Sequence, residues 1–205
     1  MRGVSVRVWA GELRLGFSMR FTCAVATAQP LPETPFQPSA NKLVAGNERF
    51  AEAFADQDLQ VSPTRHMTVV TCMDSRMDIF PLLGLGHGEA HIIRNAGGVI
   101  TDDVIRSLCL SQRYLGTREI VLVHHTDCGL QMVTEDGFKA EIEAEIGIKP
   151  WWAVESFDDP YVDVRQSMRR IEMTPFIPYK DHVRGFVYDV LTGRIEEVHT
   201  DSDDA

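Results

Sequence analysis

The chain has 205 residues, of which 44% are hydrophobic, and a formal net charge of -10 at pH 7. This length and apolar content suffice for the core of one domain, and two full domains would be a stretch. The acidic balance disfavours nucleic acid, because no cluster of Lys and Arg reverses it locally. No apolar run reaches the roughly 18 to 20 residues that a membrane-spanning helix requires, so we expect no membrane partner either.

Residues 1–40 show no sustained periodicity and end in a proline-rich piece, which predicts a poorly ordered arm outside the core. A helical pattern follows, with Asn41 as its candidate N-cap. Its apolar residues fall near one face: Leu43, Val44, Phe50 and Phe54. We place the folded domain at residues 41–199, between this arm and an acidic tail over residues 200–205.

Three short apolar runs rich in β-branched residues come next, at Met67–Thr71, Ala90–Ile93 and Glu119–His124. Continuous runs of this length predict buried parallel strands. A helix from Asp102 to Leu115 lies between the last two runs, with Thr101 as its cap and Val104, Ile105, Leu108, Cys109 and Leu115 facing inward. Strand, helix and strand in this order predict a right-handed βαβ unit.

The remaining segments predict two more helices, at about Gly137–Ile146 and Tyr161–Ile171. A strand over Gly185–Val190 then turns at Thr192-Gly193 into a second strand over Arg194–Val198, as in an edge hairpin. The sequence therefore predicts a single α/β domain with a mostly parallel central β-sheet, flanking helices and an edge hairpin at the C-terminus.

Three polar patches interrupt this pattern, at Cys72–Arg76, Arg94–Gly98 and His125–Gly129. The first and the third begin where a predicted strand ends. Because the carboxyl ends of neighbouring parallel strands face a common crevice where ligands bind, we expect these two patches to meet.

The patches contain thiol and imidazole groups at metal-ligand spacing. Zn²⁺ prefers such ligands in a tetrahedron, and a catalytic zinc keeps one of its four positions for water. Cys72, His125 and Cys128 supply three ligands, and the His-x-x-Cys spacing lets two of them come from one tight turn. We therefore expect reduced thiols and a cytoplasmic protein rather than disulfides.

The carboxylate of Asp74 follows Cys72 by two residues, and Arg76 follows by two more. Asp74 has two possible tasks: to orient a zinc-bound hydroxide through a hydrogen bond, or to close the site as the fourth ligand. Arg76 decides between them, because a guanidinium that holds Asp74 in a bidentate pair draws it off the metal.

The patterns Cys72-x-Asp74-Ser75-Arg76, Arg94-Asn95-Ala96-Gly97 and His125-x-x-Cys128-Gly129, in this order, resemble the β-class carbonic anhydrases. The resemblance runs from about Asn41 to Val198. It implies Zn²⁺ held by Cys72, His125 and Cys128, with Asp74 and Arg76 as a catalytic dyad. It also implies a homodimer or higher homo-oligomer, with the early helix packing onto the partner.

The implied reaction is the reversible hydration of carbon dioxide to bicarbonate, in which a zinc-bound hydroxide attacks CO₂. Backbone N–H groups near Gly97 and Gly98 are expected to hold the bicarbonate oxygens. Some members of the family carry Trp where this chain has Val69, as part of a bicarbonate site that keeps the enzyme closed. We therefore expect the open form here.

Four neighbouring groups receive no chemical role. We expect Cys109 in the core, Cys23 in the arm, Arg94 in an interface or core ion pair, and His124 pointing away from the metal.

Two other functions compete with this hypothesis. The same zinc suits hydrolysis of carbonyl sulfide or carbon disulfide, which are linear like CO₂, and the shape of the access path would separate these substrates. Alternatively, the chain is a non-catalytic zinc or redox-sensing interaction protein. Asp74 and Arg76 speak against the latter, because a structural zinc gains nothing from a displaceable fourth position.

Overall fold

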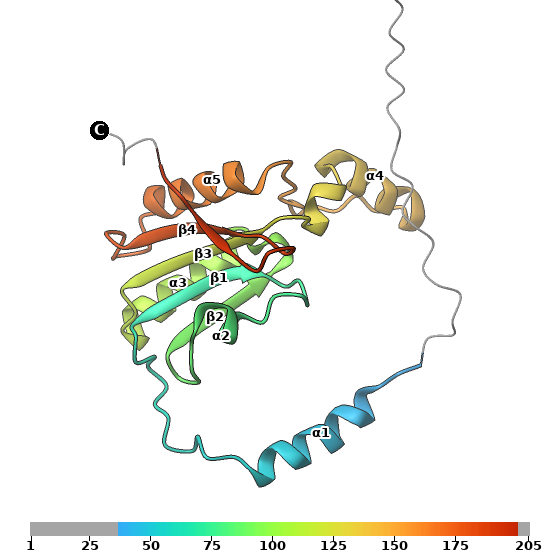
Figure 1. Ribbon diagram of the computed structural model, residues 1–205. Coiled ribbons are helices and arrows are strands. Elements are labelled where there is room, and N and C mark those ends of the chain that lie inside the picture. The colour runs from blue at the N-terminus through green and yellow to red at the C-terminus, as the bar shows by residue number, and fades with distance from the viewer. Residues whose placement is uncertain (1–36, 201–205) are drawn as a thin grey trace, which may run out of the picture. The chain divides into compact units, whose positions relative to one another are not determined.

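A five-stranded sheet forms the centre of the computed structural model, which describes residues 37–200 (Figure 1). The elements follow one another as α1 (Ala40–Glu52), β1 (Met67–Cys72), α2 (Ile79–Leu83), β2 (Ala90–Asn95), α3 (Asp102–Leu115), β3 (Glu119–His125), α4 (Glu135–Ile146), α5 (Pro160–Met173), β4 (Val183–Tyr188) and β5 (Ile195–Val198). The strand order is β2-β1-β3-β4-β5, and only β5 runs antiparallel to its neighbour. This confirms the predicted α/β fold and its C-terminal hairpin.

The first three strands begin where the sequence places them and end one or two residues later, at Cys72, Asn95 and His125. The apolar pattern stops earlier because polar side chains follow, but the backbone ladder continues, with Cys72 opposite Asn95 in the parallel register. Two of the expected metal ligands are therefore the last residues of β1 and β3.

Each face of the sheet packs its own apolar cluster. Successive residues of a strand point to opposite faces. Ile120 and Leu122 of β3 pack with residues of α3 and α5, whereas Val121 and Val123 pack with α2 and its flanking loops. A sheet covered on both faces explains why the strands read as unbroken apolar runs.

Helix α3 has the bounds and the cap that the sequence predicts. The hydroxyl of Thr101 accepts a hydrogen bond from the Val104 N–H at 3.4 Å. Its buried face differs from the expectation, because Ser111 and Gln112 are buried, whereas Cys109 is only partly so. Ser111 can be buried because its hydroxyl pairs with those of Thr68 and Thr117 at 2.8 and 2.7 Å.

Helix α1 is present, but its start differs from the expectation. It begins at Ala40 with Ser39 at the N-cap position, so the prediction that Asn41 caps it is wrong. None of its residues is buried, and Leu43, Val44 and Phe50 keep between 54% and 71% of their surface exposed. Phe54, two residues past the end of the helix, keeps 48%. The predicted arm over residues 1–40 and the tail over residues 200–205 fall almost entirely outside the described residues.

The sequence analysis missed α2 and placed two helix starts late. Five residues with a proline inside are too few to show a helical period, which explains the omission of α2. Helices α4 and α5 start earlier than predicted, because Thr134 and Asp159 cap them through the N–H groups of Gly137 and Tyr161.

Candidate metal centre

Three buried side chains converge at the carboxyl ends of β1 and β3. Cys72 ends β1, His125 ends β3, and Cys128 follows in the turn after β3. Their two sulfurs and one ring nitrogen all lie within 4.8 Å of one another. The structure thus brings together the three residues expected to be ligands, as a cluster suited to a metal ion.

The spacing and the hydrogen bonding of these atoms fit a tetrahedral metal. The sulfurs of Cys72 and Cys128 are 4.0 Å apart, and two sulfurs about 2.3 Å from a tetrahedral ion would be separated by about 3.8 Å. Nε2 of His125 is buried without a hydrogen-bond partner among the described residues. Leaving a buried polar atom unpaired is costly, and an ion held by all three groups would satisfy it.

The orientation of the His125 ring is set within its own turn. Nδ1 donates to the backbone carbonyl of Thr126 at 2.9 Å, which leaves the Nε2 lone pair free to face the two sulfurs. Burial works to lower the pKa of His125, but the neighbouring Cys72 sulfur opposes it, and the result is a raised pKa. An ion bound here therefore competes with a proton for this ring.

The two thiols have different proton affinities because they share a hydrogen bond. The hydrogen bond from Cys128 lowers the pKa of Cys72 to about 4, against the opposing effect of burial, with further help from the backbone N–H of Gly97. The pKa of Cys128, which keeps the shared proton, is raised. The lowered pKa of Cys72 favours the thiolate, the form in which cysteine binds metals.

Asp74 and Arg76 form a bidentate pair beside the cluster. Nε of Arg76 donates to Oδ1 of Asp74 at 3.0 Å, and Nη2 donates to Oδ2 at 2.7 Å. Hydrogen bonds from Arg76 lower the pKa of Asp74 to about 2, so that this carboxylate is ionised. Oδ2 of Asp74 also lies 3.7 Å from Nε2 of His125, which places it next to the ligand cluster.

The guanidinium of Arg76 also reaches the turn that carries the other two candidate ligands. Nη1 donates to the carboxylate of Asp127 at 2.8 Å, and Nη2 donates to the backbone carbonyl of the same residue at 2.8 Å. Arg76 therefore links the loop after β1 to the turn after β3.

Arg94 supports the loop after β1, a role that the sequence analysis missed. It donates to the backbone carbonyl of Cys72 at 2.9 Å and to that of Asp74 at 2.7 Å. The salt bridges of the described residues include none for Arg94, so the expected core ion pair is not found, and the expected interface pair stays a prediction. The position of Arg94 near the end of β2, which pairs with β1, is the feature that could have predicted this role.

The turn formed by Gly97 and Gly98 lies directly against Cys72. A Cβ atom on Gly98, which has a φ of +74°, would stand 2.8 Å from the Cys72 nitrogen and from the Thr71 carbonyl carbon. Only glycine fits such a close approach with a positive φ. The N–H of Gly97 donates to the Cys72 sulfur at 3.3 Å, and the expected contact of this turn with bicarbonate stays a prediction.

Two of the groups without a predicted role, His124 and Cys109, make their contacts away from the cluster. His124 points to α5, where its Nε2 meets the carboxylate of Asp163 at 2.6 Å. Cys109 is a partly buried free thiol on α3. Cys23 lies outside the described residues.

Two cavities adjoin the candidate ligands. One, of about 610 Å³, is lined by Met73, Asp74, Ser75, Arg76, Asp127, Gly129 and Met132. The other, of about 460 Å³, is lined mostly by apolar side chains, including Leu130, Phe138 and Trp152. Both exceed the size of a triatomic substrate.

None of the helices within residues 37–200 combines the length and the apolar character needed to cross a bilayer.

Comparisons with known proteins point to one family. The carbonic anhydrase family profile matches residues 67–155. Beta-carbonic anhydrase 1 of Mycobacterium tuberculosis (strain ATCC 25618 / H37Rv) is 54% identical over 155 residues, which cover 76% of this chain and 94% of that protein. A carbon disulfide hydrolase of Acidianus sp. (strain A1-3) is 35% identical over 158 residues, which cover 65% of this chain and 77% of that protein.

A solved structure gives the same result. The carbonic anhydrase of Streptococcus mutans superposes with a TM-score of 0.75 at 38% identity, covering 80% of this chain and 99% of that one. The sheet, the cluster of two thiols and an imidazole, and these likenesses agree with the resemblance that the sequence motifs predicted. The chain belongs to the β-carbonic anhydrase family.

Proposed function

We propose that this protein catalyses the reversible hydration of carbon dioxide to bicarbonate with Zn²⁺ held by Cys72, His125 and Cys128. The observation that carries the proposal is the convergence of these three buried ligand atoms within 4.8 Å of one another at two adjacent strand ends. Two sulfurs and one nitrogen are a donor set that suits zinc, and three protein ligands leave one position open for solvent.

When bound, Zn²⁺ supplies a Lewis acid that lowers the pKa of water and so makes hydroxide available for attack on the carbon of CO₂. The chain has to orient this nucleophile and hold the substrate near it. Asp74 is ionised, so it acts only as a hydrogen-bond acceptor and fixes the direction in which the attacking water donates its hydrogen.

Arg76 and Asp74 act as a dyad in this proposal. The bidentate pair turns both carboxylate oxygens of Asp74 toward the guanidinium, which opposes its binding to the metal. The pair also keeps Oδ2 beside His125. The carboxylate is therefore close enough to orient the nucleophile and is restrained from blocking it.

We propose that Gly97 and Gly98 form a wall of the substrate pocket. Both are buried, and Gly98 packs against the backbone of Cys72. Since the Gly97 N–H already serves the Cys72 sulfur, the N–H of Gly98 is the candidate donor to a bicarbonate oxygen.

The decisive experiment measures bound zinc and CO₂ hydration in the same purified sample, with wild type and Asp74→Ala compared. Wild type should contain one zinc per chain and hydrate CO₂ in stopped-flow assays. Asp74→Ala should keep its zinc and lose turnover by about 100-fold or more, the usual range for loss of a positioned acid or base. An unchanged rate in the variant would contradict the role of Asp74, and a zinc-loaded wild type that does not hydrate CO₂ would favour the redox-sensing or structural zinc alternative.

Hydrolysis of carbon disulfide or carbonyl sulfide is the second candidate function, because curated relatives with 30% to 35% identity carry the name carbon disulfide hydrolase. The greater identity to a β-carbonic anhydrase favours CO₂. Sulfide release from CS₂ and COS, measured beside CO₂ hydration on the same preparation, distinguishes the substrates.

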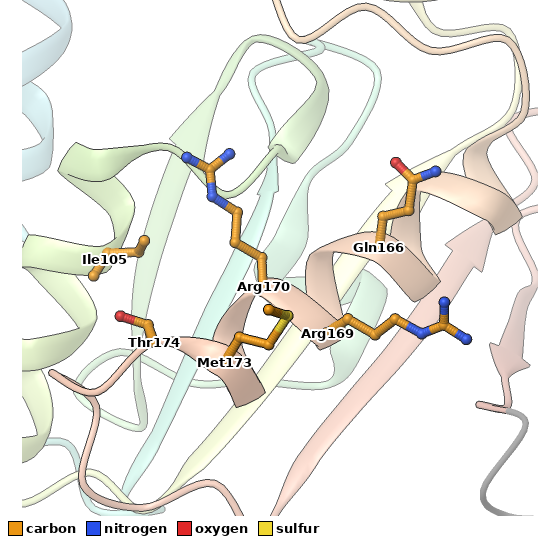
Figure 2. A pocket seen from close by; sticks show the side chains of 6 residues that line it. All are labelled: Ile105, Gln166, Arg169, Arg170, Met173 and Thr174. Atoms are coloured by element: carbon orange, nitrogen blue, oxygen red, sulfur yellow. The ribbon is translucent and has the colours of Figure 1, made fainter.

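We also propose that the protein works as a homodimer or a higher homo-oligomer. The apolar side chains of α1 remain exposed within one chain. A hollow of about 420 Å³ lies between α3 and α5, where Figure 2 shows Ile105, Arg170 and Met173 around it. A second hollow of about 550 Å³ shares Ile105 and continues along α3 to Phe176. A second copy would cover these apolar surfaces.

The boundaries and the location of the protein complete the proposal. We assign the catalytic domain to residues 41–199, with an N-terminal arm before it and an acidic tail after it. Two adjacent thiols 4.0 Å apart require a reducing environment to stay available for a metal, which favours the cytoplasm.

A further inference from the structure

The guanidinium of Arg76 forms hydrogen bonds with two aspartates, Asp74 and Asp127. Asp74 receives hydrogen bonds from Nε and Nη2, whereas Asp127 receives one from Nη1 at its carboxylate and one from Nη2 at its backbone carbonyl. All three guanidinium nitrogens are therefore engaged, and the contacts to Asp127 fix the plane in which the guanidinium faces Asp74.

The backbone of Asp127 presents both of its acceptors to the guanidinium. Its φ of +55° lies in the left-handed region, which few side chains other than those of Asn and Asp adopt at low cost. This residue lies in the turn between His125 and Cys128. The turn that carries two candidate ligands thus also carries the second support of Arg76.

The position of Arg76 matters because Asp74 has two competing partners. Its Oδ2 is 2.7 Å from Nη2 of Arg76 and 3.7 Å from the ligand nitrogen of His125. A guanidinium that turns away would leave the carboxylate free to bind a metal ion held beside it. Whatever fixes Arg76 therefore favours the arrangement with an open coordination position.

We propose that Asp127 is a positioning residue that keeps Arg76 on Asp74 and so keeps the fourth metal position accessible. The proposal rests on the metal site proposed above. The contribution of Asp127 to the stability of the fold is small, because its side chain is 76% exposed and that of Arg76 is 46% exposed. Its effect is on which partner Asp74 chooses.

Azide binding to the Co²⁺-substituted protein tests this proposal without turnover. The anion needs an open position on the metal, and its binding changes the visible absorption of Co²⁺. Asp127→Asn should raise the Kd for azide by about threefold, since the amide oxygen still accepts a weaker hydrogen bond. Asp127→Gly keeps the left-handed backbone without the side chain and should raise the Kd further, by about fivefold.

The direction of this change separates the proposal from simple electrostatics. Removing a negative charge near the site should by itself tighten the binding of an anion. A Kd that stays the same or falls in both variants would overturn the proposal. In an Asp74→Ala background, neither Asp127 substitution should raise the Kd, because no carboxylate is left to compete for the metal. A rise that persists there would also overturn it.

Glu197→Gln is the matched control, because it likewise removes the carboxylate of a side-chain ion pair with an arginine, Arg184, but on the β4–β5 hairpin. It should leave the Kd for azide unchanged. A wild-type protein that binds Co²⁺ and azide but does not hydrate CO₂ would refute the proposed function and leave the Asp127 comparison readable. A normal hydration rate with an unaltered Kd in the Asp127 variants would refute only the positioning role.

Discussion

The carboxyl ends of β1 and β3 carry the candidate ligands, whereas helix α1 carries apolar side chains on its surface. Only the side chains at the strand ends are buried within a single chain. At the strand ends, Cys72 and His125 are buried, and the backbone around them is hydrogen-bonded. In α1, no residue is buried. The candidate ligand cluster is thus assembled within one chain, whereas the apolar side chains of α1 have no cover within the described residues, as the proposed oligomer predicts.

The largest effect should come from removing a candidate ligand from the cluster at the ends of β1 and β3. Cys128→Ser should weaken zinc binding by more than about 100-fold, beyond what loss of a supporting group around a metal costs, and hydration should fall to background. Metal analysis per folded chain measures this. Cys109→Ser, a like exchange on α3, should keep the zinc content of wild type, and zinc loss in both variants would contradict the assignment.

A smaller effect should follow from adding a methyl group at Gly98, which packs against the backbone of Cys72. Gly98→Ala should lower the free energy of unfolding by about 1–3 kcal/mol, because the new Cβ meets the backbone of Thr71 and Cys72 at a positive φ. Urea unfolding of the metal-free protein measures the change. Gly129→Ala is the control, since its Cβ would meet nothing within 4 Å, and equal losses in both variants would show that packing at Gly98 is unimportant.

A charge placed on the exposed apolar face of α1 tests the proposed self-association. Phe50→Asp should weaken self-association at least about tenfold, the cost of losing an apolar anchor at an interface. The circular dichroism of the domain should change little. Sedimentation equilibrium measures the association. Ala45→Asp puts the same charge on the opposite side of α1 and should have no such effect, so equal weakening would argue against the proposed face.

The smallest effect concerns the Asp74 pair and pH. The folded pKa of Asp74 is lowered to about 2 from an unfolded value of about 3.9. The pair therefore stabilises the fold fully above about pH 4 and progressively less as the pH falls toward 2. The stability difference between metal-free wild type and Asp74→Asn should narrow across this window. A difference that stays constant would mean that the pair does not stabilise the fold.

Sequence patterns predicted the sheet and the ligand cluster because both depend on local signals. Apolar runs of four to six residues mark the strands, and the His125-x-x-Cys128 spacing places two ligands in one turn. Helix α3 was predicted to the residue because Thr101 gives a clear start signal.

The supporting contacts could not be predicted, because they join residues that are distant in sequence. The hydrogen bonds from Arg94 to the loop after β1 follow from the parallel register of β1 and β2, which no local pattern specifies. The bond between Arg76 and Asp127 spans two loops for the same reason. For α1, the amphipathic pattern predicts an apolar face but not which chain covers it, so the expectation of a partner came from the family resemblance alone.

The turn after β3 contains more than its two candidate ligands. The backbone carbonyl of Thr126 in this turn orients the His125 imidazole. The side-chain oxygen of Gln131 accepts a hydrogen bond from the Cys128 N–H at 3.0 Å. One interstrand distance then completes the site, and the Thr71 hydroxyl restrains it by donating to the Val123 carbonyl at 2.8 Å. Lining residues of the second cavity that make none of these contacts, such as Phe138 and Trp152, are therefore the ones that can change without altering the ligand cluster, and such changes would reshape the space beside it.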